Sequence, residues 1–238
     1  MADATTTTFR WGPDTYTVKS YAAPGGLAKL PAVVLVHGTE GLQGESGTEL
    51  PKLAKQIADG GFVVFVPEYF GKEPGGLPLE LVFMTRIQSV QTYAPRIAAA
   101  VDHARADPRV AAGGVGLVGL SLGGGLALQY AAAAAPGTVD AVVDFFGYID
   151  AGSSVYRDAA KLPPTLIFHN EHDGVVDVSY SVNLRDALKK HGVTHEYVPN
   201  EDDYHERKFH PFRPGGKADT ESRKKTVEWL QLHVAAAV

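Results

Sequence analysis

Residues 115–125, VGLVGLSLGGG, decide the fold, because one serine stands there between an apolar run and a run of glycines. The first four residues favour a strand, whereas residues 122–135 are rich in leucine and alanine and favour a helix. Gly119, Ser121 and Gly123 spell G-x-S-x-G, the pattern of a tight turn that strains the serine backbone and leaves no room for a flanking Cβ. We predict that Ser121 is a nucleophile between a buried strand and a helix; a glycine-rich packing turn is the alternative.

Strand-like runs alternate with helix-like segments outward from this stretch to both ends of the chain. Such alternation calls for a mostly parallel sheet with helices on both faces, whose chemistry gathers at the carboxyl ends of the strands. The expected strands are 15–21 as an edge strand, 32–36, 62–66, 115–118, 141–146, 165–169 and 195–198, and the expected helices are 49–59, 79–106 with a break or kink at Pro95, 122–135, 179–190 and 219–234.

The composition favours one domain that acts on small molecules. The 238 residues suit a single α/β domain over residues 11–238, with residues 1–10 as a disordered tail. The 22 Lys and Arg against 27 Asp and Glu form no basic block, so we expect neither a nucleic-acid nor a membrane partner. The chain has no cysteine, which excludes disulfides and thiolate catalysis, and its first ten residues lack a signal-peptide pattern. We expect a cytoplasmic protein.

A nucleophilic serine needs a histidine base, and that base needs an acid to fix its tautomer. In the chain order serine, acid, histidine, the acid should follow a later strand and the histidine should precede the last helix. Asp173 is the preferred acid, with Asp177 and Asp144 as alternatives, and His205 is the preferred base, with His210 as the alternative. An Asx turn that caps the next helix is the competing role for Asp173, and a solvated loop position is that for His205.

These motifs resemble the dienelactone hydrolase family of the α/β-hydrolase fold, from about residue 15 onward. GLSLGG at residues 119–124 is similar to the family's nucleophile turn, and HNEHDGVV at residues 169–176 resembles its acid loop. Tyr204-His205 resembles its histidine turn. PEYF at residues 67–70 and FFG at residues 145–147 are weaker landmarks of the same family.

The resemblance implies a mostly parallel α/β-hydrolase sheet and a catalytic triad of Ser121, Asp173 and His205. In this fold the oxyanion hole takes one backbone N–H from the residue after the nucleophile, Leu122, and one from the loop after the first parallel strand, most plausibly Thr39. No large cap domain is expected, because only residues 147–164 separate the relevant strands.

The chain departs from the family pattern at two positions. The usual nucleophile of the family is cysteine, so Ser121 marks either a serine-type branch or an engineered Cys-to-Ser change. The family often has a glutamate directly after the position of His37, whereas this chain has Gly38 there and Glu40 two residues further on. His37 itself is expected to have a structural role in the turn that presents the oxyanion donor.

The sequence indicates the substrate-binding side chains less clearly than it indicates the triad. Family members can clamp an anionic substrate with arginines, and aromatic side chains can form apolar walls around a small, open site. Glu40 can line the pocket or lie solvated in its loop. The candidate side chains are Glu40, Phe70, Phe83, Arg86, Tyr148 and Arg207.

The expected function is hydrolysis of small carboxylic esters or lactones through an acyl-enzyme on Ser121. No cofactor is expected, and the cluster of His169, His172, Asp173 and Asp177 does not match a zinc signature. The alternatives are a non-catalytic hydrolase-fold binding module and a Cys-to-Ser variant of a cysteine-type dienelactone hydrolase. The expected partner is the small-molecule substrate alone, and the expected state is a monomer or small homo-oligomer.

Overall fold

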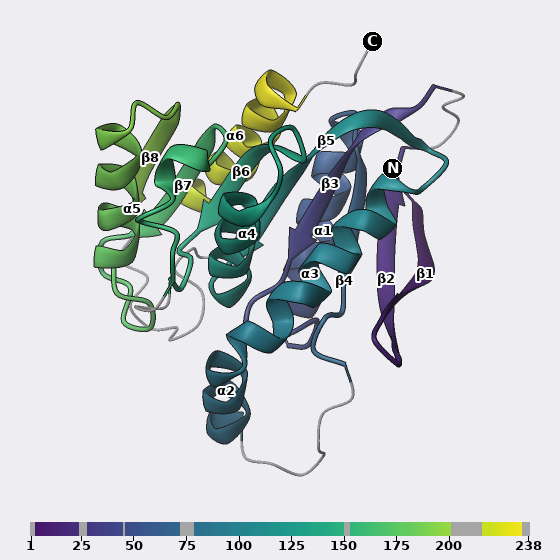
Figure 1. The fold of residues 1–238 in the computed structure, drawn as a ribbon, viewed down its shortest axis with the longest axis horizontal. Coiled ribbons are helices and arrows are strands. Elements are labelled where there is room, and N and C mark those ends of the chain that lie inside the picture. Colours follow the sequence, from purple (N-terminus) through teal and green to yellow (C-terminus); the bar gives the residue numbers. More distant parts are fainter. Residues whose placement is uncertain are drawn as a thin grey trace.

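An eight-stranded sheet organises the chain (Figure 1). The computed structural model describes residues 3–23, 28–44, 46–71, 79–149, 153–200 and 216–234. The strands lie in the order β1-β2-β4-β3-β5-β6-β7-β8; the β1–β2 and β2–β4 pairs are antiparallel and every later pair is parallel. The strands are β1 (Asp3–Trp11), β2 (Asp14–Ala22), β3 (Leu30–Val36), β4 (Val63–Pro67), β5 (Val110–Leu120), β6 (Val139–Phe145), β7 (Thr165–Asn170) and β8 (His195–Asn200).

Helices cover both faces of the sheet, as the alternation of segments predicted (Figure 1). One face packs against α1 (Ser46–Asp59) and α6 (Lys217–His233). The other packs against α3 (Val90–Arg105), α4 (Leu122–Ala133), α5 (Ser179–Lys190) and the short 3-10 helix η1 (Ala159–Lys161), while α2 (Leu79–Gln88) contacts α3. In the part of the chain that the structure describes, no helix combines the length and apolarity needed to cross a bilayer.

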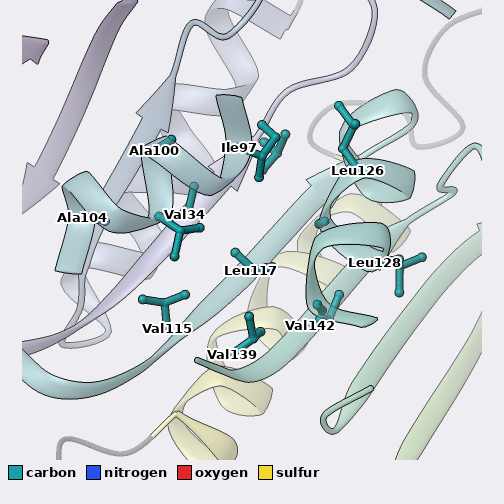
Figure 2. Packing of buried hydrophobic residues seen from close by; sticks show 14 of the residues in the cluster. Val34, Ile97, Ala100, Ala104, Val115, Leu117, Leu126, Leu128, Val139 and Val142 are labelled. Atoms are coloured by element: carbon teal, nitrogen blue, oxygen red, sulfur yellow. The ribbon is translucent and has the colours of Figure 1, made fainter. Parts of the chain in front are cut away.

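The core forms on the two sides of the sheet because successive side chains of a strand point to opposite faces. On β3, Val34 belongs to the layer beneath α3 and α4, and Val33 belongs to the layer beneath α1 and α6. Figure 2 shows Val34 near Ile97 of α3, and Leu126 of α4 above the sheet. Each fully buried Val, Leu or Ile side chain contributes on the order of 1.5–3 kcal/mol, so this double layer stabilises the strand ends that carry the site.

The N-terminal residues form a strand, so the prediction of a disordered tail over residues 1–10 is wrong from residue 3 onward. β1 pairs with β2 along its whole length, and β2 therefore lies inside the sheet and not at its edge. Phe9 is 4% exposed and stacks on Tyr16 with 5.2 Å between ring centroids. The threonines that resemble a polar tail are β-branched and suit a strand once a partner strand takes up their backbone hydrogen bonds.

The predicted helical region over residues 79–106 is interrupted at Ser89 and not at Pro95. Ser89 separates α2 from α3, and its Oγ donates to the Thr85 carbonyl at 2.7 Å. Pro95 lies inside α3. A serine hydroxyl that donates to a backbone carbonyl competes with the hydrogen bonds of the helix. Here this bond lies at the end of α2.

Candidate active site

The turn between β5 and α4 holds Ser121 in a strained conformation. Its φ is +53° and its ψ is −120°, a combination that costs a non-glycine residue on the order of 1–3 kcal/mol. The Ser121 N–H donates to the Phe145 carbonyl at 2.9 Å, and the Ser121 carbonyl accepts from Gly124 at 2.9 Å and from Tyr148 at 3.0 Å. Groups from β6, α4 and the loop after β6 thus hold the strained residue in place.

The neighbouring loop contains a second left-handed residue. Phe146, directly after β6, has a φ of +45°, and its N–H donates to the Phe168 carbonyl on β7 at 2.7 Å. Ser121 and Phe146 are the two non-glycine residues with positive φ among the described residues. Ser121 follows β5 and Phe146 follows the neighbouring parallel strand β6, so backbone strain is concentrated at the carboxyl ends of these two strands.

Glycine is required on both sides of Ser121 because backbone atoms occupy the places of the missing side chains. A Cβ on Gly119 would lie 2.4 Å from the Gly123 carbonyl oxygen, and a Cβ on Gly123 would lie 2.3 Å from the Val36 carbonyl oxygen. The first turn of α4 therefore rests directly on the ends of β5 and β3. Strand, tight turn and helix occur where the G-x-S-x-G pattern predicted them.

The turn after β3 runs beside the candidate nucleophile. A Cβ on Gly38 would lie 3.2 Å from the Ser121 Cβ and 3.8 Å from its Oγ. The Gly41 N–H closes the turn by donating to the Gly38 carbonyl at 3.1 Å. Among the described residues, no backbone carbonyl accepts the N–H group of Leu122 or of Thr39. Both predicted oxyanion donors therefore belong to segments next to Ser121.

His37 is a buried, neutral part of this turn. Its Nδ1–H donates to the Gly38 carbonyl at 2.9 Å, and its ring stacks on Tyr69 with 4.2 Å between centroids. The Tyr69 hydroxyl donates to the His37 carbonyl at 2.7 Å. Burial lowers the pKa of His37 from 6.5 to about 4, and the positive charge of Arg86 acts in the same direction. His37 thus fixes the turn in the neutral form.

Arg86, predicted as a substrate-binding residue, contacts the protein itself. The side chain is buried, and its Nη1 donates to the Thr39 carbonyl. The guanidinium carbon lies 4.1 Å from the centroid of the Phe70 ring. Arg86 therefore joins α2 to the turn that contains Thr39, the predicted oxyanion donor.

The remaining predicted substrate-binding residues are only partly placed. Glu40 is half-buried in the turn after β3. Tyr148 is half-buried after β6, and its ring meets that of Tyr180 edge-on with 5.5 Å between centroids. The predicted base His205, its alternative His210, the candidate Arg207 and the side chain of Phe83 lie outside the described residues.

Asp173, the predicted acid, anchors its own loop after β7. Its Oδ1 accepts the N–H groups of Val175 at 2.8 Å and Val176 at 3.0 Å, so the Asx turn considered as its alternative role is present. Its Oδ2 lies 3.6 Å from His169 Nε2, and no described residue hydrogen-bonds this oxygen. The side chain is only 5% exposed. One carboxylate oxygen thus holds the loop while the other is left for a further donor.

His169, next to Asp173, is committed to the structure. Its Nε2–H donates to the Val176 carbonyl at 3.0 Å, and its Nδ1 pairs with the Ser181 hydroxyl at 2.7 Å. Burial lowers its pKa. Because both nitrogens are occupied, His169 offers neither a base nor a metal ligand. Across the described ranges, no three His, Asp or Glu side chains converge on a possible metal position.

The alternative acid Asp177 is a helix cap. Its Oδ1 accepts the Ser179 N–H at 2.8 Å at the start of α5, and these hydrogen bonds to Ser179 lower its pKa. Asp177 is also exposed. Its carboxylate is therefore accounted for by the capping of α5.

Asp144 is a fully buried carboxyl beneath the strained turn. It pairs in register with Gly119, and a Cβ on Gly124 would lie 2.2 Å from its Oδ1. Neither oxygen has a hydrogen-bond partner among the described residues. Burial raises its pKa from 3.8 to about 7, and the nearby Gly147 N–H opposes that rise without reaching hydrogen-bonding geometry. Sequence reasoning considered Asp144 only as an alternative acid and did not foresee this isolation.

The shifted pKa values of Asp144 and His37 should make the free energy of unfolding depend on pH in opposite directions. The folded state holds the Asp144 proton more tightly, with a pKa of about 7 against 3.8, so stability falls by about 3 kcal/mol as pH rises from 4 to 7. The folded state holds the His37 proton less tightly, with a pKa of about 4 against 6.5, so stability rises by about 3 kcal/mol between those values. The two contributions nearly cancel between pH 4 and 6.5.

Single substitutions should expose the cancellation. We expect the free energy of unfolding of Asp144→Asn to rise with pH between 4 and 6.5 relative to the unsubstituted protein, and that of His37→Asn to fall. Urea denaturation at half-unit pH intervals measures both slopes. Identical slopes in all three proteins would show that neither group is perturbed as described.

Solved structures of other proteins show the fold class of this chain. The chain has the α/β-hydrolase fold without a large cap. A dienelactone hydrolase from Anabaena variabilis has a TM-score of 0.71 at 20% identity, covering 98% of this chain and 99% of that one. A dienelactone hydrolase-like promiscuous phosphotriesterase from metagenomic libraries has a TM-score of 0.79 at 18% identity, covering 98% and 99%. A fungal esterase from Rhizomucor miehei has a TM-score of 0.74 at 14% identity, covering 98% and 84%.

The sequence then establishes the family. Residues 16–234 match the dienelactone hydrolase family, and the chain belongs to it. None of the curated proteins matches the chain by sequence. The predicted fold class and family are therefore confirmed.

Proposed function

We propose that this chain is a serine hydrolase that cleaves small carboxylic esters or lactones through an acyl-enzyme on Ser121. One observation carries the proposal: a serine with φ of +53° lies at the end of β5, beside the turn that contains Gly38. The strained backbone of Ser121 costs free energy and adds nothing to the stability of the fold. Residues strained in this way cluster at active sites. Membership of the dienelactone hydrolase family supports the same reaction class.

In the proposed reaction, the Ser121 Oγ attacks the carbonyl carbon and its proton passes to His205. The N–H groups of Leu122 and Thr39 hold the negative charge that develops on the carbonyl oxygen. His205 then protonates the leaving alkoxide, and water cleaves the acyl-enzyme by the reverse sequence. In a lactone the alkoxide stays attached to the acyl group, and the product is a hydroxy acid.

The electrostatics near Ser121 favour this charge development. Leu122 is the first residue of α4, a twelve-residue helix, and helix N-termini stabilise nearby negative charge. The acid role falls to Asp173, because its Oδ1 is tied to the loop while its Oδ2 is left to accept the Nδ1–H of the base. The acid then stabilises the imidazolium that forms during attack.

Covalent labelling tests the proposal against the non-catalytic binding module. A fluorophosphonate should add its phosphonyl group to the peptide that contains Ser121, because only an activated serine with a working base reacts. Ser181 provides a matched control, since its hydroxyl pairs with His169 but the residue is fully buried. Ser181→Ala should label normally and Ser121→Ala should not. An unlabelled native protein would favour the binding module.

The Cys-to-Ser alternative makes a different prediction. If Ser121 replaces a native cysteine, Ser121→Cys should hydrolyse esters faster than the serine protein does. Gly38 argues against this alternative, because the glutamate that often holds the family's thiol ready is missing at that position. We expect Ser121→Cys to be the slower enzyme in a steady-state assay with short activated esters.

A further inference from the structure

Arg86 is enclosed in a way that is unusual for an arginine. It lies in the last turn of α2 and is 7% exposed. Arginine side chains are rarely buried unless they are paired. Here the Nη1 donor reaches across 47 sequence positions to the Thr39 carbonyl. The contact therefore joins a helix to the turn beside Ser121.

The ring of Phe70 fixes the plane of the guanidinium. The Arg86 guanidinium carbon lies 4.1 Å from the Phe70 centroid, a cation–π distance. Phe70 in turn meets the His37 ring edge-on at 4.7 Å and lies 3.7 Å from the place of a Cβ on Gly41. Arg86 is thus held by an aromatic ring that packs on the same turn.

The turn needs such an anchor because its glycines allow its backbone many conformations. It contains Gly38 and Gly41, the latter with a φ of +69°, and glycine loses more conformational freedom on ordering than any other residue. The Gly41-to-Gly38 hydrogen bond closes the turn on one side. The bond from Arg86 to the Thr39 carbonyl constrains the residue whose own N–H is the proposed oxyanion donor.

We propose that Arg86 is a positioning residue that keeps the Thr39 N–H aligned with the oxyanion, and that it does not clamp the substrate. This role rests on the proposed function of Ser121. Loss of one oxyanion donor costs about 10²-fold to 10³-fold in turnover. Arg86 acts on this donor indirectly, through the Thr39 carbonyl. Its loss should therefore cost part of that factor in turnover, about 10-fold to 10²-fold.

The two roles differ in their kinetic signature. A clamp acts on a charged substrate group in the ground state, so its loss raises KM for anionic esters only. A positioning residue acts on the transition state, so its loss lowers kcat for neutral and anionic esters alike and leaves KM nearly unchanged. Phenyl acetate and the phenyl monoester of succinic acid form a matched pair of substrates.

The chain offers a control arginine at the neighbouring turn. Arg96 also uses its Nη1 to hold backbone carbonyls, those of Tyr69 at 3.0 Å and Phe70 at 2.7 Å, but makes no contact with Thr39. We expect Arg86→Gln to lose about 10-fold to 10²-fold in kcat on both esters, and Arg86→Lys, which retains one donor, to lose about tenfold or less. Arg96→Gln should stay within about threefold of the native kcat.

A transition-state analogue separates alignment from a general loss of structure. A trifluoromethyl ketone forms a charged tetrahedral adduct with a catalytic serine, so its inhibition constant should rise in Arg86→Gln by the same factor as kcat/KM falls. Thermal unfolding checks that each variant is folded, and Arg86→Lys carries the test if Arg86→Gln is not. A loss confined to the anionic ester, or an unchanged kcat on phenyl acetate, overturns the positioning role.

The outcome also distinguishes this inference from the proposed function. A native protein that reacts with fluorophosphonate, with Arg86→Gln as fast as the native protein on both esters, overturns the role of Arg86 alone. A native protein that neither reacts nor hydrolyses either ester overturns both.

Discussion

Ser121→Ala is expected to lower kcat for short activated esters by about 10⁶-fold, as removal of the nucleophile does in serine proteases with the same chemistry. The fold should survive, because alanine and serine have similar difficulty in adopting the φ of +53° that this position requires. The hydrogen bonds that hold the turn come from the Ser121 backbone and remain in the variant. Initial rates with phenyl acetate, corrected for spontaneous hydrolysis, measure the loss.

Ser181→Ala serves as the matched control for this experiment. Ser181 lies in α5, and its hydroxyl pairs with His169 at 2.7 Å. Its removal leaves a buried imidazole nitrogen without a partner, so it should cost about 1–3 kcal/mol of stability and leave kcat unchanged. If Ser121→Ala keeps more than a tenth of the native rate, Ser121 is not the nucleophile.

Asp173→Asn is expected to lower kcat by about 10⁴-fold, the loss seen when the acid of a serine-protease triad becomes an amide. The substitution is informative because asparagine can preserve the Asx turn: its Oδ1 can still accept from Val175 and Val176. What changes is the second oxygen, which becomes an amide nitrogen that donates. That change leaves the loop intact and removes the acceptor that fixes the tautomer of the base.

Two measurements decide between the catalytic and the structural role of Asp173. Asp177→Asn changes a neighbouring carboxylate that caps α5 through the Ser179 N–H, and it should leave kcat within about threefold of the native value. Asp173→Ala removes the turn as well and should lower the melting temperature. Full activity of Asp173→Asn together with a lowered melting temperature of Asp173→Ala would assign Asp173 to the Asx turn alone.

The sequence predicted the features that short motifs encode. The run from residue 115 to 125 specifies strand, turn and helix locally, because each glycine answers a steric demand within a few residues. β1 was missed because its stability comes from pairing with β2, and an isolated threonine run carries no sign of that partner. A strand whose partner must be known first is not readable from periodicity alone.

Side-chain contacts at the site were harder to predict for the same reason. Arg86 was chosen from its location, yet its bond to Thr39 bridges two segments with no common spacing. The isolation of Asp144 depends on how closely the first turn of α4 approaches β6. The roles of Ser121, Asp173 and His205 stay predictions until the labelling and kinetic experiments are done.

The paired left-handed residues have a consequence for enzyme engineering. Ser121 and Phe146 follow adjacent strands and are tied together through Phe145 and Tyr148, so their backbones form one mechanical unit. Randomising the residues around Phe146 would therefore disturb the backbone of Ser121 as well. A mutagenesis library aimed at new substrates is better placed on α2, where the side chains of Leu81 and Met84 are exposed and support neither strained residue.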